Sequence, residues 1–223
     1  MLLEAIRKNR YNLAVFRDRY RAAYAALGVP LTSSHALEAD RLTALSELGL
    51  PDALWDYYAV AGNEHRFNHS FNRLLAPEDI VVQDGRIVFM EENQAAVLWG
   101  VNPNVANPFV EQGINSDTQP LEWHSEDVAC AEFCETMLYV QATFGEALEH
   151  VVSAVVPSDF ERRLETQFQS VGRIGTLSAY APEGCALTFM PWSDDEWCVF
   201  GGFHTLEQKR AIARELELHW EDL

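Results

Sequence analysis

The segment from Gly85 to Val101, which reads GRIVFMEENQAAVLWGV, constrains the fold of this 223-residue chain more than any other. Two apolar runs, residues 87–90 and 95–101, flank the polar residues Glu-Glu-Asn-Gln. Both runs are short and rich in β-branched and aromatic side chains, which is typical of strands rather than helices. The segment therefore predicts a β-hairpin in which residues 91–94 form the turn and fix the strand register.

The neighbouring carboxylates of this turn, Glu91 and Glu92, raise the question of catalysis. Adjacent residues on an extended chain point to opposite faces, so the two groups would not converge on one bond. In a tight turn they could converge, but both would then be solvated and ionised. The chain also has no Gly-x-Ser-x-Gly nucleophile elbow and no Gly-Lys-Ser/Thr phosphate loop. A turn or a contact surface is therefore favoured over a catalytic pair.

Helical periodicity predicts a basic N-terminal helix, a second helix that ends at Gly49 and a short aromatic helix that ends at Gly62. A longer helix is predicted with Ser125 as its N-cap. The last helix is predicted to begin at the capping box Thr205-Leu206-Glu207-Gln208. These helices span approximately residues 2–24, 34–48, 51–62, 125–144 and 205–218.

Three further strands are predicted near the C-terminus, at residues 176–180, 185–190 and 197–200, with turn residues between them. Residues 63–84 and 102–120 are polar or contain prolines, and we expect them to be irregular or extended. The chain has no repeat and no flexible linker. One α+β domain that spans residues 1–223 is therefore the simplest prediction.

The charge of the chain is strongly negative, at −18, with a sequence pI of about 4.6. Between Leu74 and Phe160 it has fifteen acidic residues and one basic residue, Arg86. Such a surface repels phosphate backbones and anionic lipids, so we expect no nucleic-acid or membrane partner. It would attract a basic protein. The alternative is an acidic surface that serves solubility alone.

Two pairs of residues have the spacing of metal ligands. His65 and His69 are four residues apart, as are Cys130 and Cys134, but neither pair has an obvious third ligand. We interpret the histidines as surface residues and the cysteines as small buried side chains. Cys185 and Cys198 lie in neighbouring predicted strands, and a disulfide would require that the register oppose them. We predict no metal and no cofactor.

The candidate partner-binding residues are acidic residues in predicted turns and connections, together with one tryptophan beside an acidic turn. A tryptophan in such a position is a typical interface anchor. These candidates are Glu91, Glu92, Glu111, Asp117, Glu122, Trp192, Asp194, Asp195 and Glu196.

Several motifs resemble the SUKH superfamily (Smi/Knr-like proteins), over about residues 37–145. The most specific is the string Phe-Met-Glu-Glu-Asn-Gln followed by Val-Leu-Trp-Gly-Val, within residues 89–101. Leu50-Pro51 with Tyr57-Tyr58, and Asn72-Arg73-Leu74-Leu75, precede it, and Asn107-Pro108-Phe109-Val110 follows it. The N-terminal basic helix and the strand–helix segment after residue 146 lie outside the resemblance.

The resemblance implies an α+β fold with a central mixed β-sheet flanked by helices, and a protein that is not an enzyme. Bacterial members of the family resemble immunity proteins, which bind and neutralise polymorphic toxins, often nucleases. We therefore expect an immunity-type protein that binds a cognate basic toxin through its acidic surface. The alternative is a regulatory or scaffolding protein of the same superfamily. The chain has no apolar run of signal-peptide or membrane-span length, so we expect it in the cytoplasm.

Overall fold

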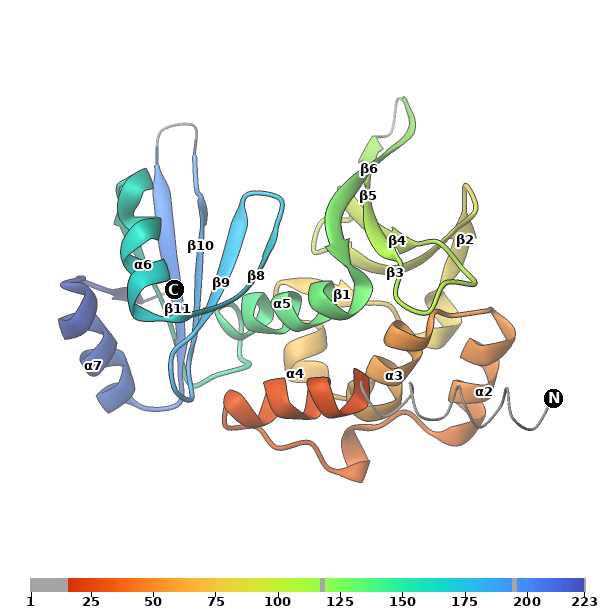
Figure 1. The fold of residues 1–223 in the computed structure, drawn as a ribbon, viewed down its shortest axis with the longest axis horizontal. Helices are drawn as coiled ribbons and strands as arrows, with labels where there is room; N and C mark the ends of the chain where they lie inside the picture. The colour runs from red at the N-terminus through yellow and green to blue at the C-terminus, as the bar shows by residue number, and fades with distance from the viewer. Residues whose placement is uncertain (1–15, 117–118, 194–195, 223) are drawn as a thin grey trace.

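The computed structural model describes residues 16–116, 119–193 and 196–222. Helix α5 (Cys130–Ala142) lies between two β-sheets, and the N-terminal helices cover one side of α5 and of the first sheet (Figure 1). The long strands of both sheets extend on the opposite side of α5 in this view. The predicted α+β class with flanking helices is confirmed. Its strands form two sheets, and every pairing is antiparallel.

The N-terminal layer is built from short helices, most of which follow the predicted positions, but α4 lies within residues 63–84, where an irregular or extended chain was expected. The chain is helical from residue 16 to residue 26, and the rest of the first predicted helix lies outside the described residues. The aromatic helix is confirmed as α3 (Asp52–Ala61), with Gly62 as its C-cap. The other elements of this layer are η1 (Ser33–His35), α2 (Ala39–Glu47) and α4 (His65–Asn68).

The first sheet has the strand order β1-β3-β4-β5-β6, and β2 also pairs with β3. The predicted hairpin is confirmed as β3 and β4. Glu91 and Glu92, however, are the last residues of β3, opposite Arg73 and Asn72 of β1, so the turn comprises residues 93–96. The elements are β1 (Asn72–Leu74), η2 (Pro77–Asp79), β2 (Val81–Gln83), β3 (Arg86–Glu92), β4 (Val97–Val101), β5 (Phe109–Ser116) and β6 (Gln119–Ala129).

Helix α5 begins later than predicted, because the residues after Ser125 belong to strand β6. Ser125 is opposite Glu111 of β5, and the helix begins at Cys130. Its first turn is capped from a distant loop, where the side-chain oxygen of Asn107 accepts the Ala131 N–H at 2.8 Å. The prediction that Ser125 is the N-cap was therefore wrong, because Asn107, 24 positions before Ala131, supplies the acceptor.

The second sheet has the strand order β12-β7-β11-β10-β9-β8. The three predicted strands are confirmed as β9 to β11, and Thr205 caps the last helix through the predicted capping box with Gln208. Strands β7, β8 and β12 and helix α6 were not predicted from the sequence. The elements are β7 (His150–Val156), η3 (Ser158–Phe160), α6 (Glu161–Gln167), β8 (Gln169–Ile174), β9 (Leu177–Ala181), β10 (Ala186–Pro191), β11 (Trp197–Phe203), α7 (Leu206–Leu216) and β12 (Glu221–Asp222).

The main hydrophobic core is continuous across α5. Eleven of the thirteen residues of α5 are buried, and the core that contains them includes side chains of both sheets. The two remaining residues of the helix, Glu132 and Glu135, are half-buried and form ion pairs with Arg19 of the N-terminal helix. A second core lies on the other face of the second sheet, beneath α6 and α7. No helix among the described residues is long and apolar enough to cross a membrane.

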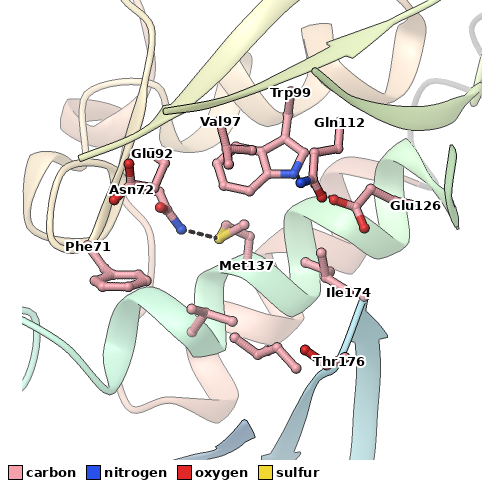
Figure 2. A pocket seen from close by; sticks show the side chains of 13 residues that line it. Phe71, Asn72, Glu92, Val97, Trp99, Gln112, Glu126, Met137, Ile174 and Thr176 are labelled. Atoms are coloured by element: carbon pink, nitrogen blue, oxygen red, sulfur yellow. Dashed lines mark hydrogen bonds between the residues drawn. The ribbon is translucent and has the colours of Figure 1, made fainter. Parts of the chain in front are cut away.

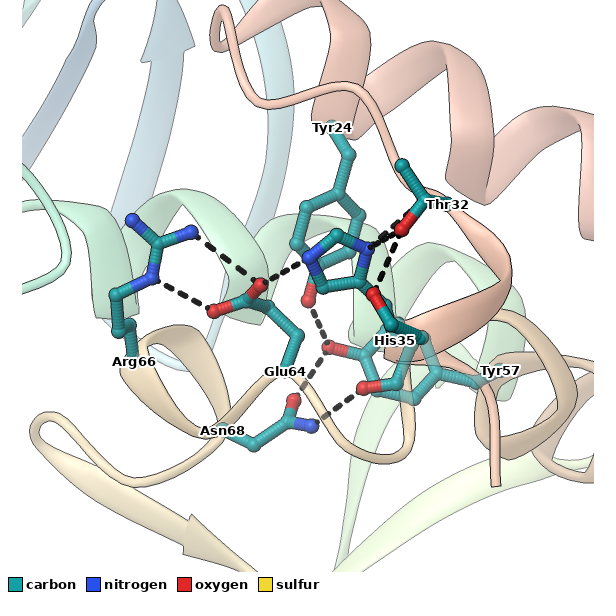
Figure 3. A network of polar contacts seen from close by, with 9 residues as sticks. Tyr24, Thr32, His35, Tyr57, Glu64, Arg66 and Asn68 are labelled. Atoms are coloured by element: carbon teal, nitrogen blue, oxygen red, sulfur yellow. Dashed lines mark hydrogen bonds and ion pairs between the residues drawn. The ribbon is translucent and has the colours of Figure 1, made fainter. Parts of the chain in front are cut away.

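A polar network fixes the N-terminal layer (Figure 3). The buried carboxylate of Glu64 accepts Arg66 Nε at 2.9 Å and lies 3.0 Å from His35 Nε2. His35 Nδ1 accepts the Thr32 N–H at 2.8 Å, so Nε2 carries the proton that faces Glu64. These groups satisfy one another, and we therefore assign the network a structural role.

We predict that Gly202→Ala in β11 destabilises the fold. A Cβ at this position would overlap the backbone carbonyl oxygen of Ala142, at the end of α5. Forcing atoms into such a contact should lower the free energy of unfolding by about 1–3 kcal/mol. Urea denaturation measures this change. Val155→Ala, which truncates an exposed side chain of the neighbouring strand, is the control and should shift stability by less than about 0.5 kcal/mol. Equal stability of the two variants would contradict the prediction.

Candidate functional site

One face of the first sheet carries a row of side chains across neighbouring strands. Asn72 is opposite Glu92, Met90 is opposite Trp99, and Trp99 is opposite Gln112. Directly opposed residues project to the same face, and residues two apart on one strand do as well. Asn72, Glu92, Trp99 and Gln112 therefore share a face, and this face is directed toward α5.

These side chains form one wall of a groove between the two sheets (Figure 2). Met137 and Val140 of α5 form the floor, and residues 174–177, at the turn between β8 and β9, form the opposite wall. The cavity has a volume of about 260 Å³. It is thus slightly smaller than the roughly 300–1,000 Å³ of sites that enclose a drug-sized ligand.

The groove is acidic. Glu92 and Glu126 contribute two carboxylates, and the described residues that line the groove include no lysine, arginine or histidine. Asn72, Gln112 and Thr176 supply the remaining polar side chains. The other lining side chains are apolar, so a ligand in this groove would meet negative charge in a partly desolvated setting, where charge interactions are stronger than in water.

Glu126 is the central polar residue of the groove. Trp99 Nε1 donates a hydrogen bond to its Oε1 at 2.9 Å, and Figure 2 shows both side chains at the same end of the cavity. Burial raises the pKa of the Glu126 carboxyl, and the nearby Asp127 adds to this, although the Trp99 hydrogen bond acts in the opposite direction. The protein therefore holds an incompletely compensated carboxyl in this position.

Asn72 places a second polar group in the groove. Its side chain is buried, with 4% of the residue exposed, and its Nδ2 lies 3.2 Å from the Met137 sulfur, toward which it points in Figure 2. Its Oδ1 has no hydrogen-bond partner among the described residues. Gln141 of α5 anchors the backbone, because its Oε1 accepts the Asn72 N–H at 2.8 Å. An unpaired acceptor in a rigidly held side chain is costly unless a ligand satisfies it.

Two of the predicted partner-binding acids lie on the other face of the sheet, where they form ion pairs. Glu91 points away from its neighbour Glu92 and pairs with Arg73, with an Nε to Oε1 distance of 2.8 Å. Glu111 accepts two hydrogen bonds from Arg86, at 2.7 and 2.8 Å. Their charge is therefore largely compensated within the chain.

The other predicted residues differ in position. Glu92 lines the groove, and Glu122 of β6 is exposed, four residues before Glu126 on the same strand face. Trp192 is 56% exposed, although its ring centroid lies 5.3 Å from that of Phe200, and Glu196 is exposed near it. Asp117, Asp194 and Asp195 lie outside the described residues.

The candidate metal ligands do not form a larger cluster in the part of the chain that the structure describes. The rings of His65 and His69 pack edge to face with their centroids 5.1 Å apart, and Cys130 and Cys134 are buried in α5. The register places Met190 opposite Cys198, so Cys185 does not face it, and both thiols are free. No group of three or more histidine, cysteine or acidic residues is arranged to hold a metal ion in these residues.

The sequence analysis missed Asn72, Gln112 and Glu126 as site residues. Glu126 was assigned to the first turn of a helix, and Asn72 only to a motif. Strand alternation would have placed Trp99 on the same face as Val97, but only the register connects these residues to β1 and β5. Comparisons with protein-family models, with curated proteins and with solved structures found no match to this chain.

We predict that Glu126→Gln stabilises the folded protein at neutral pH. Since the folded-state pKa of Glu126 is raised above its ordinary 4.5, the folded state retains a proton that the unfolded state releases. The stability contributed by this group is therefore lost as the pH rises from about 4.5 through the folded pKa, whereas a glutamine does not titrate.

Urea denaturation of both proteins at several pH values tests this prediction. The advantage of Glu126→Gln over the wild type should grow across the window above pH 4.5 and then remain constant. As a control, Glu122→Gln changes an exposed carboxylate of the same strand and should alter stability at neutral pH by less than about 0.5 kcal/mol. A Glu126→Gln variant less stable than the wild type at neutral pH would contradict the account.

Proposed function

We propose that this chain is a cytoplasmic protein-binding protein of the immunity type, which neutralises a basic toxin by direct contact. The observation that carries the proposal is the groove between the sheets, which has two carboxylates, an unpaired amide oxygen and no cation among its described lining residues. Such a groove is complementary to a basic protein surface. The resemblance of residues 37–145 to the SUKH superfamily supports a toxin as that partner.

The positions of the acidic residues support a two-step association with the basic partner. Glu92 and Glu126 line the groove, and Glu122 extends the acidic face along β6 into solvent. Exposed charge of one sign accelerates the encounter with an oppositely charged partner, and desolvated contacts then slow dissociation. In this proposal Glu122 steers the partner, while the groove retains it. Binding would block the active site or the substrate channel of the toxin.

We predict that Glu122→Lys weakens capture of the toxin encoded beside this gene, chiefly by slowing association. Glu92→Lys, which puts a cation into the groove, should weaken capture further. Co-purification and association kinetics at low and high salt measure both effects, and wild-type binding should weaken as salt rises. Glu215→Lys is the matched control, because it makes the same charge change at an exposed position on α7.

The same proteins can be tested for protection of cells that express the toxin. Wild type and Glu215→Lys should protect, and Glu92→Lys should not. If no complex forms and no protection is seen with the wild type, the toxin-neutralising function is wrong. Capture of other basic proteins without protection would instead support the regulatory or scaffolding alternative.

A further inference from the structure

We propose that the groove between β4, β6, α5 and the β8–β9 turn is a binding pocket for a guanidinium group. The inference rests on the proposed function for the source of that group, an arginine side chain of the partner, but the pocket can be tested without the partner. The groups that would recognise it are Glu126, Glu92 and Asn72.

The size of the pocket fits a single side chain. Its volume of about 260 Å³ falls below the range of roughly 300–1,000 Å³ that encloses drug-sized ligands. An elongated cation of a few heavy atoms can enter it, whereas a folded peptide segment cannot. The pocket therefore suits one projecting residue of a partner or a small alkylguanidine.

The polar groups of the pocket require donors. Glu126 Oε1 accepts from Trp99, but Oε2 receives no hydrogen bond from the described residues. Glu92 Oε2 accepts the Gln94 N–H at 2.9 Å within its own turn, and the Glu92 side chain also lines the groove. The buried Asn72 Oδ1 also lacks a described partner, and the Asn72 side chain would have to rotate to offer this oxygen to a ligand in the groove. A guanidinium group offers five N–H donors in a planar fork, whereas an ammonium group offers three.

The apolar surfaces of the pocket favour the same ligand. Met137, Val140 and Leu177 provide a surface along which the methylene stem of an arginine can lie. A guanidinium group is also more weakly hydrated than an ammonium group, so it loses less on entering a partly desolvated site. We therefore expect the pocket to prefer guanidinium over ammonium, and to reject a neutral group of the same shape.

Two larger cavities elsewhere do not offer this combination. A cavity of about 520 Å³ between the N-terminal helix and α5 is lined by Arg19 and Glu135, which form an ion pair with each other. Another, of about 420 Å³ beside α6 and α7, includes Glu183 and Glu215 but no buried acceptor that lacks a partner among the described residues. Of these three cavities, the groove between the sheets is the one that combines carboxylates without an ion-pair partner among the described residues with a buried amide oxygen that also lacks one.

The test is a titration of the purified protein with n-butylguanidinium, n-butylammonium and n-butylurea, followed by NMR. Shifts of the Trp99 indole N–H report binding, since this group donates to Glu126. We expect n-butylguanidinium to bind most tightly, n-butylammonium more weakly and n-butylurea at least about tenfold more weakly, because urea is neutral and forms no ion pair with the carboxylates. Binding of n-butylurea as tight as that of n-butylguanidinium, or no binding of n-butylguanidinium, would overturn the proposal.

Two variants locate the site. Glu126→Gln should weaken n-butylguanidinium binding by about tenfold or more, the usual effect of losing a hydrogen bond to a charged group. Its expected gain in stability means that lost binding would not reflect unfolding. Glu215→Gln, on α7 and outside the groove lining, should leave n-butylguanidinium binding unchanged. If n-butylguanidinium binds Glu126→Gln as tightly as the wild type and shifts the Trp99 signal of both variants, the assignment of the pocket to Glu126 is wrong.

A last comparison separates this inference from the proposed function and identifies the source of the cation. A blocked Gly-Arg-Gly peptide that binds more tightly than n-butylguanidinium indicates a protein side chain, and weaker peptide binding indicates a free guanidine compound. Both results support a guanidinium pocket. If n-butylguanidinium binds but no toxin complex forms, the pocket is supported and the proposed function is wrong. A toxin complex that forms equally well with Glu126→Gln would show that no arginine of the toxin occupies the pocket, and would leave the proposed function intact.

Discussion

The burial of α5 is the constraint on which the rest of the structure depends. A helix whose side chains are buried on nearly all sides needs apolar cover from several directions, and no single sheet can supply it. The first sheet, the second sheet and the N-terminal helices each provide part of that cover. The close approach of Gly202 to Ala142 and the cap that Asn107 gives to Ala131 are consequences of this arrangement.

The groove follows from the same arrangement. Two sheets that share one helix diverge above it, and the side chains that face this space come from both. There the inner face of the first sheet changes from apolar to polar, with Glu92 and Asn72 side by side and Glu126 on the edge strand β6. Holding a carboxyl and an unpaired amide oxygen in such a setting lowers stability. Residues that do so are typical of functional sites, where binding rather than folding satisfies them.

Features set by neighbouring residues could be predicted from the sequence, and features set by distant contacts could not. The β3–β4 hairpin depends on alternation within one segment, and the cap of α7 depends on Thr205 and Gln208, three residues apart. The start of α5 depends instead on Asn107 and on the pairing of Ser125 with β5. For the same reason the number of acidic residues is known from the sequence, but their surroundings are not. Only the pairing of β1 with β3 shows that Glu92 lines the groove while Glu91 forms an ion pair.

The central claim is that the structure holds Glu126 ready for a cation that none of the described lining residues supplies. The most direct measurement is the pKa of the Glu126 carboxyl, from a ¹³C NMR titration with and without saturating n-butylguanidinium. The account predicts a pKa above the ordinary 4.5 in the protein alone, because burial disfavours the charge, and a marked fall when the cation binds. A pKa that is not raised in the protein alone, or that the cation does not change, would contradict it.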